Sequence, residues 1–377
     1  MNDTDILKNL VAHRRYLHTI PEIGNSELKT SAYIKEQIVL TCPDEVLSMD
    51  GTGIKAVYLC GKSGAQTFGF RSDIDALPIT EKSSCPVQSG HPGMMHACGH
   101  DGHMATLLTF ASIVGQKKRE GTLKHNIVLL FQPAEETTGG AKQMIDEGAL
   151  ENPHVDKMFG MHVMPQVEKG TVALSPGDVM ASNNYIILRF HGKAAHGAQP
   201  HNGFDAAGAM ASAYVQLQSY MTHAVPASEA AVLTFGKMNA GTQRNIVAGE
   251  AVMEGILRTY NSGIQKKLLS EILPVCQSAA MPYHVTVTME TECDYPTVHN
   301  DAELFREFSD CVPSRVEQAP IMIAEDYSFF SVCRPSLFAF VGVGDEKRRS
   351  ALHTDTFDLD EEALIPAVRY YVNVIEK

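Results

Sequence analysis

The residues that could do chemistry are densest between positions 95 and 103. This segment reads MHACGHDGH and holds one thiol, one carboxylate and three imidazoles. Thiolate, imidazole and carboxylate groups together are the ligands that zinc and similar transition metals prefer. A thiol hydrolase that uses Cys98 with His100 is an alternative, but residues two positions apart would need an unusual geometry to act as nucleophile and base. The segment therefore favours a metal site.

Two adjacent glutamates offer both a metal ligand and a base. The side chains of Glu135 and Glu136 point in different directions, so one can bind a metal while the other remains free. A bound metal lowers the pKa of water towards about 7, and a nearby carboxylate can take that proton and pass it to a leaving amine. The pair therefore predicts metal-assisted hydrolysis with one glutamate as the general base.

The first part of the chain predicts alternating strands and helices. Hydrophobic periodicity indicates helices over 27–40, 102–118 and 140–148 and strands over 54–60, 67–70, 126–131 and 157–163. Strands that alternate with helices are typical of βαβ units, so we expect an α/β domain with a mostly parallel sheet flanked by helices.

The pattern changes from about residue 182. Strands are expected over 185–191, 231–236, 247–259 and 285–291, with helices over 204–222 and 263–280. That order is typical of an α+β domain with an antiparallel sheet. The chain then returns to the first pattern with a helix over 302–311, a strand over 336–343 and a helix over 361–375. We therefore predict a discontinuous catalytic domain of residues 1–181 and 294–377, and an inserted domain of residues 182–293.

Several side chains that could bind a metal follow strands of the first domain. They are Asp73, Asp75, Glu135, Glu136, His162 and His353. Ligands of open parallel sheets bind at the carboxyl ends of the strands, where residues far apart in sequence meet. We expect these side chains and the 95–103 segment to form one metal site.

Composition limits the partners. The 377 residues carry 31 Lys and Arg against 44 Asp and Glu, a net charge of −13. An acidic chain is a poor ligand for nucleic acid or for anionic lipid. No apolar run approaches the roughly 18 residues of a membrane span, and the first residues are acidic rather than basic, so we expect no membrane partner and a cytoplasmic location. Eight irregularly spaced cysteines indicate reduced thiols.

Several motifs in order along the chain carry a family resemblance. They are RSDIDALP at 71–78, MHACGHDGH at 95–103, QPAEE at 132–136, GMH at 160–162, AED at 324–326 and LHT at 352–354. Together they resemble the amidohydrolase branch of the aminoacylase and glutamate-carboxypeptidase metallopeptidase superfamily. That branch includes hippurate hydrolases, indoleacetyl-amino-acid hydrolases and N-acetyldiaminopimelate deacetylases.

The resemblance implies a centre with two divalent metal ions and assigns a role to each motif. The implied ligands are Cys98, which would bridge the ions, His100, Glu136, His162 and His353. Glu135 would be the general base, and Asp73 would orient a ligand. We expect Asp101 to accept a hydrogen bond from a ligating histidine. Zinc is the expected ion, with manganese, cobalt and nickel as alternatives.

The inserted domain resembles the lid or dimerisation domain of that family. The resemblance assigns His196 to stabilising the oxyanion, and Asn245 and Arg258 to binding the substrate. A guanidinium would suit a substrate carboxylate, which it can bind with two parallel hydrogen bonds. The segment NIVA at 245–248 lacks the proline usual in the family, as the diaminopimelate-deacetylase group does. A homodimer or larger homo-oligomer through this domain is expected.

We therefore predict an amidohydrolase that cleaves an N-acyl amino acid, such as N-acetyldiaminopimelate or hippurate, to a carboxylate and a free amino acid. A dipeptidase or carboxypeptidase on the same scaffold is the alternative enzyme. A metal-dependent binding protein without turnover is the alternative of a different class, because a fold does not guarantee an activity.

Overall fold

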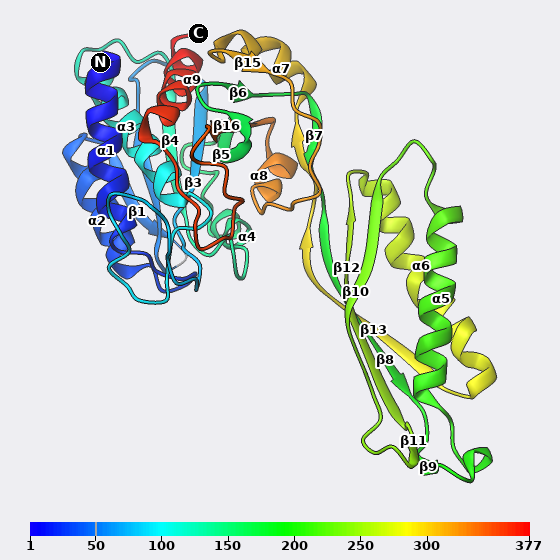
Figure 1. The fold of residues 1–377 in the computed structure, drawn as a ribbon. Coiled ribbons are helices and arrows are strands. Elements are labelled where there is room, and N and C mark those ends of the chain that lie inside the picture. Colours follow the sequence, from blue (N-terminus) through cyan, green and yellow to red (C-terminus); the bar gives the residue numbers. More distant parts are fainter. Residues whose placement is uncertain (50) are drawn as a thin grey trace. The chain divides into compact units, whose positions relative to one another are not determined.

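A computed structural model describes residues 1–49 and 51–377 (Figure 1) and divides the chain into two compact units. Unit 1 consists of Met1–Val179, His299–Ala319 and Asp326–Lys377, and unit 2 of Met180–Val298 and Pro320–Glu325. The bounds expected from the sequence lie near these divisions. No sequence pattern indicated that the segment 320–325 belongs to unit 2.

Unit 1 is built on one eight-stranded sheet. The strands, in spatial order, are β1 (Glu45–Met49), β2 (Gly53–Tyr58), β4 (Asn126–Gln132), β3 (Thr67–Asp73), β5 (Lys157–Glu168), β16 (Ser336–Gly344), β6 (Val172–Ala173) and β15 (Arg315–Val316). The four central strands β4, β3, β5 and β16 run parallel, and β1 and β2 pair antiparallel to their neighbours. Strand β6 pairs antiparallel with β16 and parallel with β15. The predicted fold class, a mostly parallel catalytic sheet, is confirmed.

Helices cover the sheet of unit 1. They are α1 (Asp3–His18), α2 (Leu28–Leu40), α3 (His100–Arg119), α4 (Gly140–Asp146), α7 (Ala302–Phe308), α8 (Ser328–Cys333) and α9 (Ile365–Glu376), with 3-10 turns at η3 (Ser309–Cys311) and η4 (Glu361–Leu364). Helix α3 packs on β3 and contacts α1 and α9, whereas α4 and α8 contact each other, β4 and β16. Helix α3 begins two residues earlier than predicted, which places His100 in its first turn.

The sheet opens at its carboxyl edge between β3 and β5. The ladder between these strands ends at Phe70 and Phe159. Strand β3 continues alongside β4 as far as Asp73, and β5 continues alongside β16 beyond His162. His162 therefore lies within a strand that is longer than predicted rather than at its end. The opening gives side chains from α3 access to both strands.

Unit 2 has its own sheet and core. Its strands, in spatial order, are β10 (Ala231–Ala240), β12 (Glu250–Thr259), β8 (Asn183–His191) and β13 (Thr286–Tyr295), all antiparallel. One face carries α5 (Ala206–Ala224) and α6 (Ser262–Ala280), which bury Leu217 and Leu268 against it. The predicted antiparallel α+β domain is confirmed.

Shorter elements complete the chain. They are the paired strands β9 (Ala195–His196) and β11 (Ile246–Val247), the paired strands β7 (Gly177–Met180) and β14 (Val298–Asn300), and the turns η1 (Pro200–Asn202) and η2 (Met281–Tyr283). The strand predicted over 247–259 is two strands, because β11 pairs with β9 while β12 pairs with β8 and β10. Within the described ranges, no helix combines the length and apolar character needed to cross a bilayer.

Two buried side chains of α1 hold the start of α3. Arg14 donates from Nε to Asp101 Oδ2 at 2.9 Å, and His18 Nδ1 lies 2.7 Å from the same oxygen. The other nitrogen of His18 lies 3.0 Å from Glu81 Oε1. Burial disfavours the charged imidazole, but the hydrogen bonds to Asp101 and Glu81 outweigh it and raise the pKa of His18 to about 9. At neutral pH this side chain is an imidazolium between two carboxylates.

We expect His18→Gln to lower the free energy of unfolding by about 1 to 3 kcal/mol near pH 6, because charge-assisted hydrogen bonds are lost. The folded-state pKa lies above the unfolded value of about 6.5, so this contribution is fully present below pH 6.5 and is lost as the pH rises through about 9. Urea unfolding of the wild type and of His18→Gln at pH 6 and pH 10 measures the difference in their free energies of unfolding. An equal difference at the two pH values would contradict the charge assignment.

Candidate metal centre

Two groups of potential metal ligands share the thiol of Cys98. Cys98 with His100 and His162 forms one group, and Cys98 with Glu136 and His353 forms the other. Cys98 Sγ lies 3.3 Å from His162 Nε2 and 3.3 Å from His353 Nε2. Glu136 Oε1 lies 2.9 Å from His353 Nε2 and 4.0 Å from His100 Nε2. The structure thus brings all five predicted ligands together.

Loops with unusual backbone conformations position these ligands. Gly99 has φ +85° at the cap of α3, and a side chain there would collide with Val163. His353 also has a positive φ of 62°, and its N–H donates to the Ala97 carbonyl at 2.9 Å. That bond ties the loop of His353 to the loop of Cys98. Residues 255 positions apart in sequence are joined in this way.

Hydrogen bonds turn the Nε2 atoms of two histidines towards the thiol. His162 Nδ1 donates to the Val163 carbonyl at 2.7 Å, and His100 Nδ1 lies 2.9 Å from the Asp75 carbonyl and 3.2 Å from Asp75 Oδ1. Asp75 Oδ2 accepts the Glu136 N–H at 2.9 Å. Such partners on the outer nitrogen are typical of metal-ligating histidines.

A buried atom at the centre, Nε2 of His100, lacks a hydrogen-bond partner among the described residues. A buried polar atom without a partner costs free energy, and His100 belongs to one ligand group with Cys98. A thiol, imidazoles and a carboxylate are a fitting donor set for divalent cations of the zinc type. The residues present therefore fit a cation.

Burial and neighbouring charge set the protonation of the ligands. Burial, with Glu136 and Glu135 nearby, raises the pKa of the Cys98 thiol, because a thiolate would face two carboxylates. Burial lowers the pKa of His162 to about 3, so this imidazole is neutral and can offer a lone pair. For His100, burial is outweighed by Asp73 and Asp75, which raise its pKa to about 10. Ligands of this kind release protons when a cation binds.

One side of the centre is open to solvent. The side chain of His353 is 53% exposed, whereas Glu136 is 10% exposed and His100 is 1% exposed. Glu135 is partly exposed, and one of its oxygens lies within 4.8 Å of ligand atoms of His100 and Glu136. A substrate can therefore approach from the side of His353 and Glu135.

Of two predicted carboxylates, Asp73 lies beside a proposed ligand and Asp101 does not. Asp73 Oδ2 lies 3.7 Å from His100 Nε2, and its hydrogen bonds go to Arg71 and His103. Asp101, expected beside a ligating histidine, instead binds Arg14 and His18, because the first turn of α3 directs it towards α1. The carboxylate that contacts His100 Nδ1 is Asp75, which we expected at the same strand end but to which we assigned no role. Its place two residues after Asp73 was the available signal.

The predicted substrate residues of unit 2 lie in two places. Strand pairing sets His196 opposite Ile246, and Gly197 N–H donates to the Asn245 carbonyl at 2.8 Å, so His196 and Asn245 are neighbours. Arg258 lies near the end of β12 that is remote from this pair, where it donates to the Met322 carbonyl at 3.2 Å. Figure 1 shows β9 and β11 at one end of the sheet. The structure does not bring Arg258 together with His196 and Asn245.

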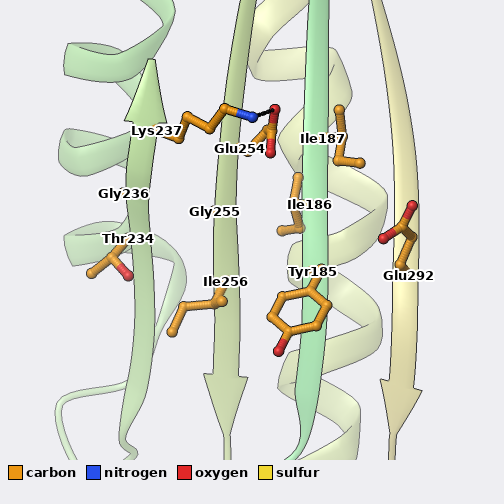
Figure 2. A pocket seen from close by; sticks show the side chains of 10 residues that line it. All are labelled: Tyr185, Ile186, Ile187, Thr234, Gly236, Lys237, Glu254, Gly255, Ile256 and Glu292. Carbon is orange, nitrogen blue, oxygen red and sulfur yellow. Dashed lines mark hydrogen bonds and ion pairs between the residues drawn. The ribbon is translucent and has the colours of Figure 1, made fainter. Parts of the chain in front are cut away.

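A hollow of about 460 Å³ lies on the face of the unit 2 sheet opposite its helices. Figure 2 shows Gly236 and Gly255 among the residues that line it, together with the ion pair between Lys237 and Glu254, whose charged atoms lie 2.7 Å apart. None of the predicted site residues lines it. This hollow is therefore separate from the candidate metal centre.

Comparison with known proteins gives a consistent result. The sequence profile of peptidase family M20/M25/M40 matches residues 69–377. The chain is 33% identical over 375 residues to N-acetyl-L-cysteine deacetylase of Bacillus subtilis (strain 168), covering 97% of this chain and 87% of the relative. It is 35% identical over 358 residues to N-acetyldiaminopimelate deacetylase of Exiguobacterium sibiricum, covering 93% and 94%.

A solved structure is similar over the whole chain. It is a dinuclear metal-binding peptidase of the M20 family from Bacillus subtilis, with a TM-score of 0.86 and 28% identity, covering 100% of this chain and 98% of that one. The family resemblance read from the motifs is confirmed.

Because Cys98 belongs to both ligand groups, we expect Cys98→Ala to lose both metal ions. His162→Ala and His353→Ala should each lose one, so that bound metal falls from about two ions per chain to about one in each case. Elemental analysis after reconstitution and desalting measures the content. A Cys98→Ala protein that keeps two ions would contradict the shared thiol.

Proposed function

The chain belongs to peptidase family M20/M25/M40, and on that basis we propose that it is a metal-dependent amidohydrolase that cleaves N-acyl amino acids. The observation that carries the proposal is the pair of ligand groups that share Cys98, with Glu135 beside them. Relatives that match nearly the whole chain are named deacetylases of N-acetylcysteine and of N-acetyldiaminopimelate. The proposed substrate therefore carries an acetyl group, and the products are acetate and a free amino acid.

The five ligands proposed from the sequence would hold two divalent cations, with zinc as the proposed ion. These ligands are Cys98, His100, Glu136, His162 and His353. When bound, such cations acidify water and polarise a carbonyl group. In support, the donor set is mixed thiol, imidazole and carboxylate, and buried Nε2 of His100 lacks another partner in the described part of the chain.

Glu135 is the proposed general base. It lies three residues beyond the end of β4, it is partly exposed, and it lies beside Glu136 without being needed as a ligand. In this role Glu135 takes a proton from the attacking water and returns it to the departing amine. Asp73, held by Arg71 and His103 at 3.7 Å from His100 Nε2, is proposed to orient that histidine through its charge.

The substrate contacts of unit 2 point to two copies of the chain. Strand β12 has ten residues, and at about 3.3 Å per residue it is roughly 30 Å long. An acetylated amino acid is only about 10 Å long. His196 and Asn245 at one end of β12 and Arg258 at the other therefore cannot reach the same substrate molecule within one copy. We assign the oxyanion contact of His196 and the amide contact of Asn245 to the site of a second copy, and the carboxylate contact to Arg258.

An edge strand offers a place for such a homodimer. Strand β10 ends the unit 2 sheet, and Thr234, Gly236 and Met238 on it are exposed. An unpaired strand edge is a template for pairing with an identical strand. Lys237 is the charged residue in this stretch of β10, and its side chain is already paired with Glu254.

We also place the protein in the cytoplasm, since all eight of its cysteines are free thiols in the structure.

Glu135→Gln should bind metal as the wild type does and lose turnover by about 100-fold or more, because a general base is removed without removing a ligand. Matched assays on N-acetyl amino acids and on dipeptides with free amino termini test the reaction class. Preference for a free amino terminus would favour a dipeptidase. Tight binding without release of an amine would favour a binding protein. Near-normal turnover by Glu135→Gln would remove the assignment of the base.

Mixing two inactive variants tests whether the second copy contributes. Glu135→Gln and His196→Ala are each expected to be inactive, but half of the dimers that form after mixed refolding contain one of each. In these dimers one of the two sites has both groups, so the mixture should recover about a quarter of wild-type activity. No recovery, with dimers present by light scattering, would show that His196 acts within its own chain.

A further inference from the structure

His103 occupies the opening between β3 and β5 in unit 1. It is 1% exposed and reaches both strands from α3. Its Nδ1 lies 2.6 Å from Asp73 Oδ1 at the end of β3, and its Nε2 accepts the Val163 N–H of β5 at 2.9 Å. The direct ladder between these strands has already ended at Phe70 and Phe159. The imidazole therefore replaces the missing backbone pairing.

The hydrogen bonds of His103 define its tautomer. A backbone N–H can only donate, so Nε2 of His103 must be the unprotonated nitrogen that accepts from Val163. The ring proton then lies on Nδ1 and is donated to the carboxylate of Asp73. Both nitrogens are used, so His103 has no lone pair for a cation. Its proximity to His100 and Asp73, all within 4.8 Å, does not make it a ligand.

Two proposed ligands pack directly against His103. Its ring centroid lies 4.6 Å from that of His162 and 5.3 Å from that of His100. Val163, which His103 holds through its N–H, also accepts the Nδ1 proton of His162 through its carbonyl at 2.7 Å. His103 thus sets both the spacing of the two rings and the residue that turns His162 Nε2 towards Cys98.

A buried ion network keeps Asp73 in place beneath His103. Arg71 donates to Asp73 Oδ2 at 2.8 Å and to Asp326 Oδ1 at 2.8 Å. Asp326 Oδ2 in turn accepts from Gln132 Nε2 at 2.7 Å and from the Ala141 N–H at 3.0 Å. All the side chains of this network are buried. A group held by several charge-assisted bonds is a rigid support for the histidine above it.

We propose that His103 is a positioning residue that bridges the open strands and holds His100 and His162 in place to bind one cation with Cys98. It does not itself bind the cation. The inference rests on the proposed metal centre, but it is tested by metal binding alone and does not require amide hydrolysis. It predicts damage to one of the two ligand groups, because Glu136 and His353 make no contact with His103 in the described residues.

Two substitutions of His103 distinguish its hydrogen bond to Asp73 from its hydrogen bond with Val163. His103→Asn can still donate to Asp73 but loses the acceptor for Val163, whereas His103→Gln can still accept from Val163. We expect His103→Asn to lower the affinity for one of two zinc ions by about 10-fold to 100-fold and to leave the affinity for the other unchanged. His103→Gln should lower the same affinity by less. His125→Asn is the matched control, because His125 stacks on Phe68 in the same unit, with ring centroids 4.2 Å apart. Competition with a chromogenic chelator measures both affinities.

Nuclear magnetic resonance of the wild type gives a second measurement that needs no variant to fold. With ¹¹³Cd and ¹⁵N-labelled histidine, scalar coupling to cadmium is expected at Nε2 of His100 and His162 and at neither nitrogen of His103. The ¹⁵N shifts of His103 should show a proton on Nδ1. Coupling to His103, a proton on its Nε2, or two zinc affinities unchanged in both variants would each overturn the inference. Failure of the wild type to hydrolyse any N-acetyl amino acid would overturn only the proposed reaction.

Discussion

The structure of unit 1 depends on keeping a buried group of like-charged and polar side chains around one thiol. Asp73, Asp75 and Glu136 each place a carboxylate oxygen within 4.0 Å of a ring nitrogen of His100, and burial of such groups costs several kcal/mol each unless they are paired. Arg71 and His100, whose pKa these carboxylates raise, balance part of this charge. Nε2 of His100 has no hydrogen-bond partner among the described residues, and His100 belongs to one ligand group with Cys98. The side chains that fit a metal ion are therefore part of the same cluster whose burial costs free energy.

The parallel sheet makes this concentration of charge possible. Strands β3, β4 and β5 bring their carboxyl ends to one edge, and the turn before α3 adds Cys98 and His100. The opening between β3 and β5 gives side chains of α3 access to both strands, and His103 spans it with two hydrogen bonds. We propose that this imidazole supports the site without being one of its ligands.

The two units have separate hydrophobic cores and different proposed roles. Unit 1 buries the metal centre behind its own sheet and helices, while unit 2 has an independent core around Leu217 and Leu268. Two residues proposed to contact substrate lie apart on unit 2, Arg258 near one end of β12 and His196 beyond the other end. We propose that this layout separates the groups that perform hydrolysis from those that recognise the substrate. The same proposal links activity to assembly, because one copy cannot supply both ends of β12 to one small molecule.

Sequence alone determined the fold class, the family and the five side chains that meet at the candidate centre, because hydrophobic periodicity and the order of the motifs are local properties of the chain. It did not determine which carboxylate supports which histidine. Asp101 is adjacent to His100 in sequence, whereas Asp75 belongs to the motif at 71–78. The packing of α3 against α1 turns Asp101 towards Arg14 and His18, and it is Asp75 that contacts His100. The role of His103 and the distance between Arg258 and His196 were also decided by tertiary structure. Both depend on where strands separate or end in space, which no local pattern encodes.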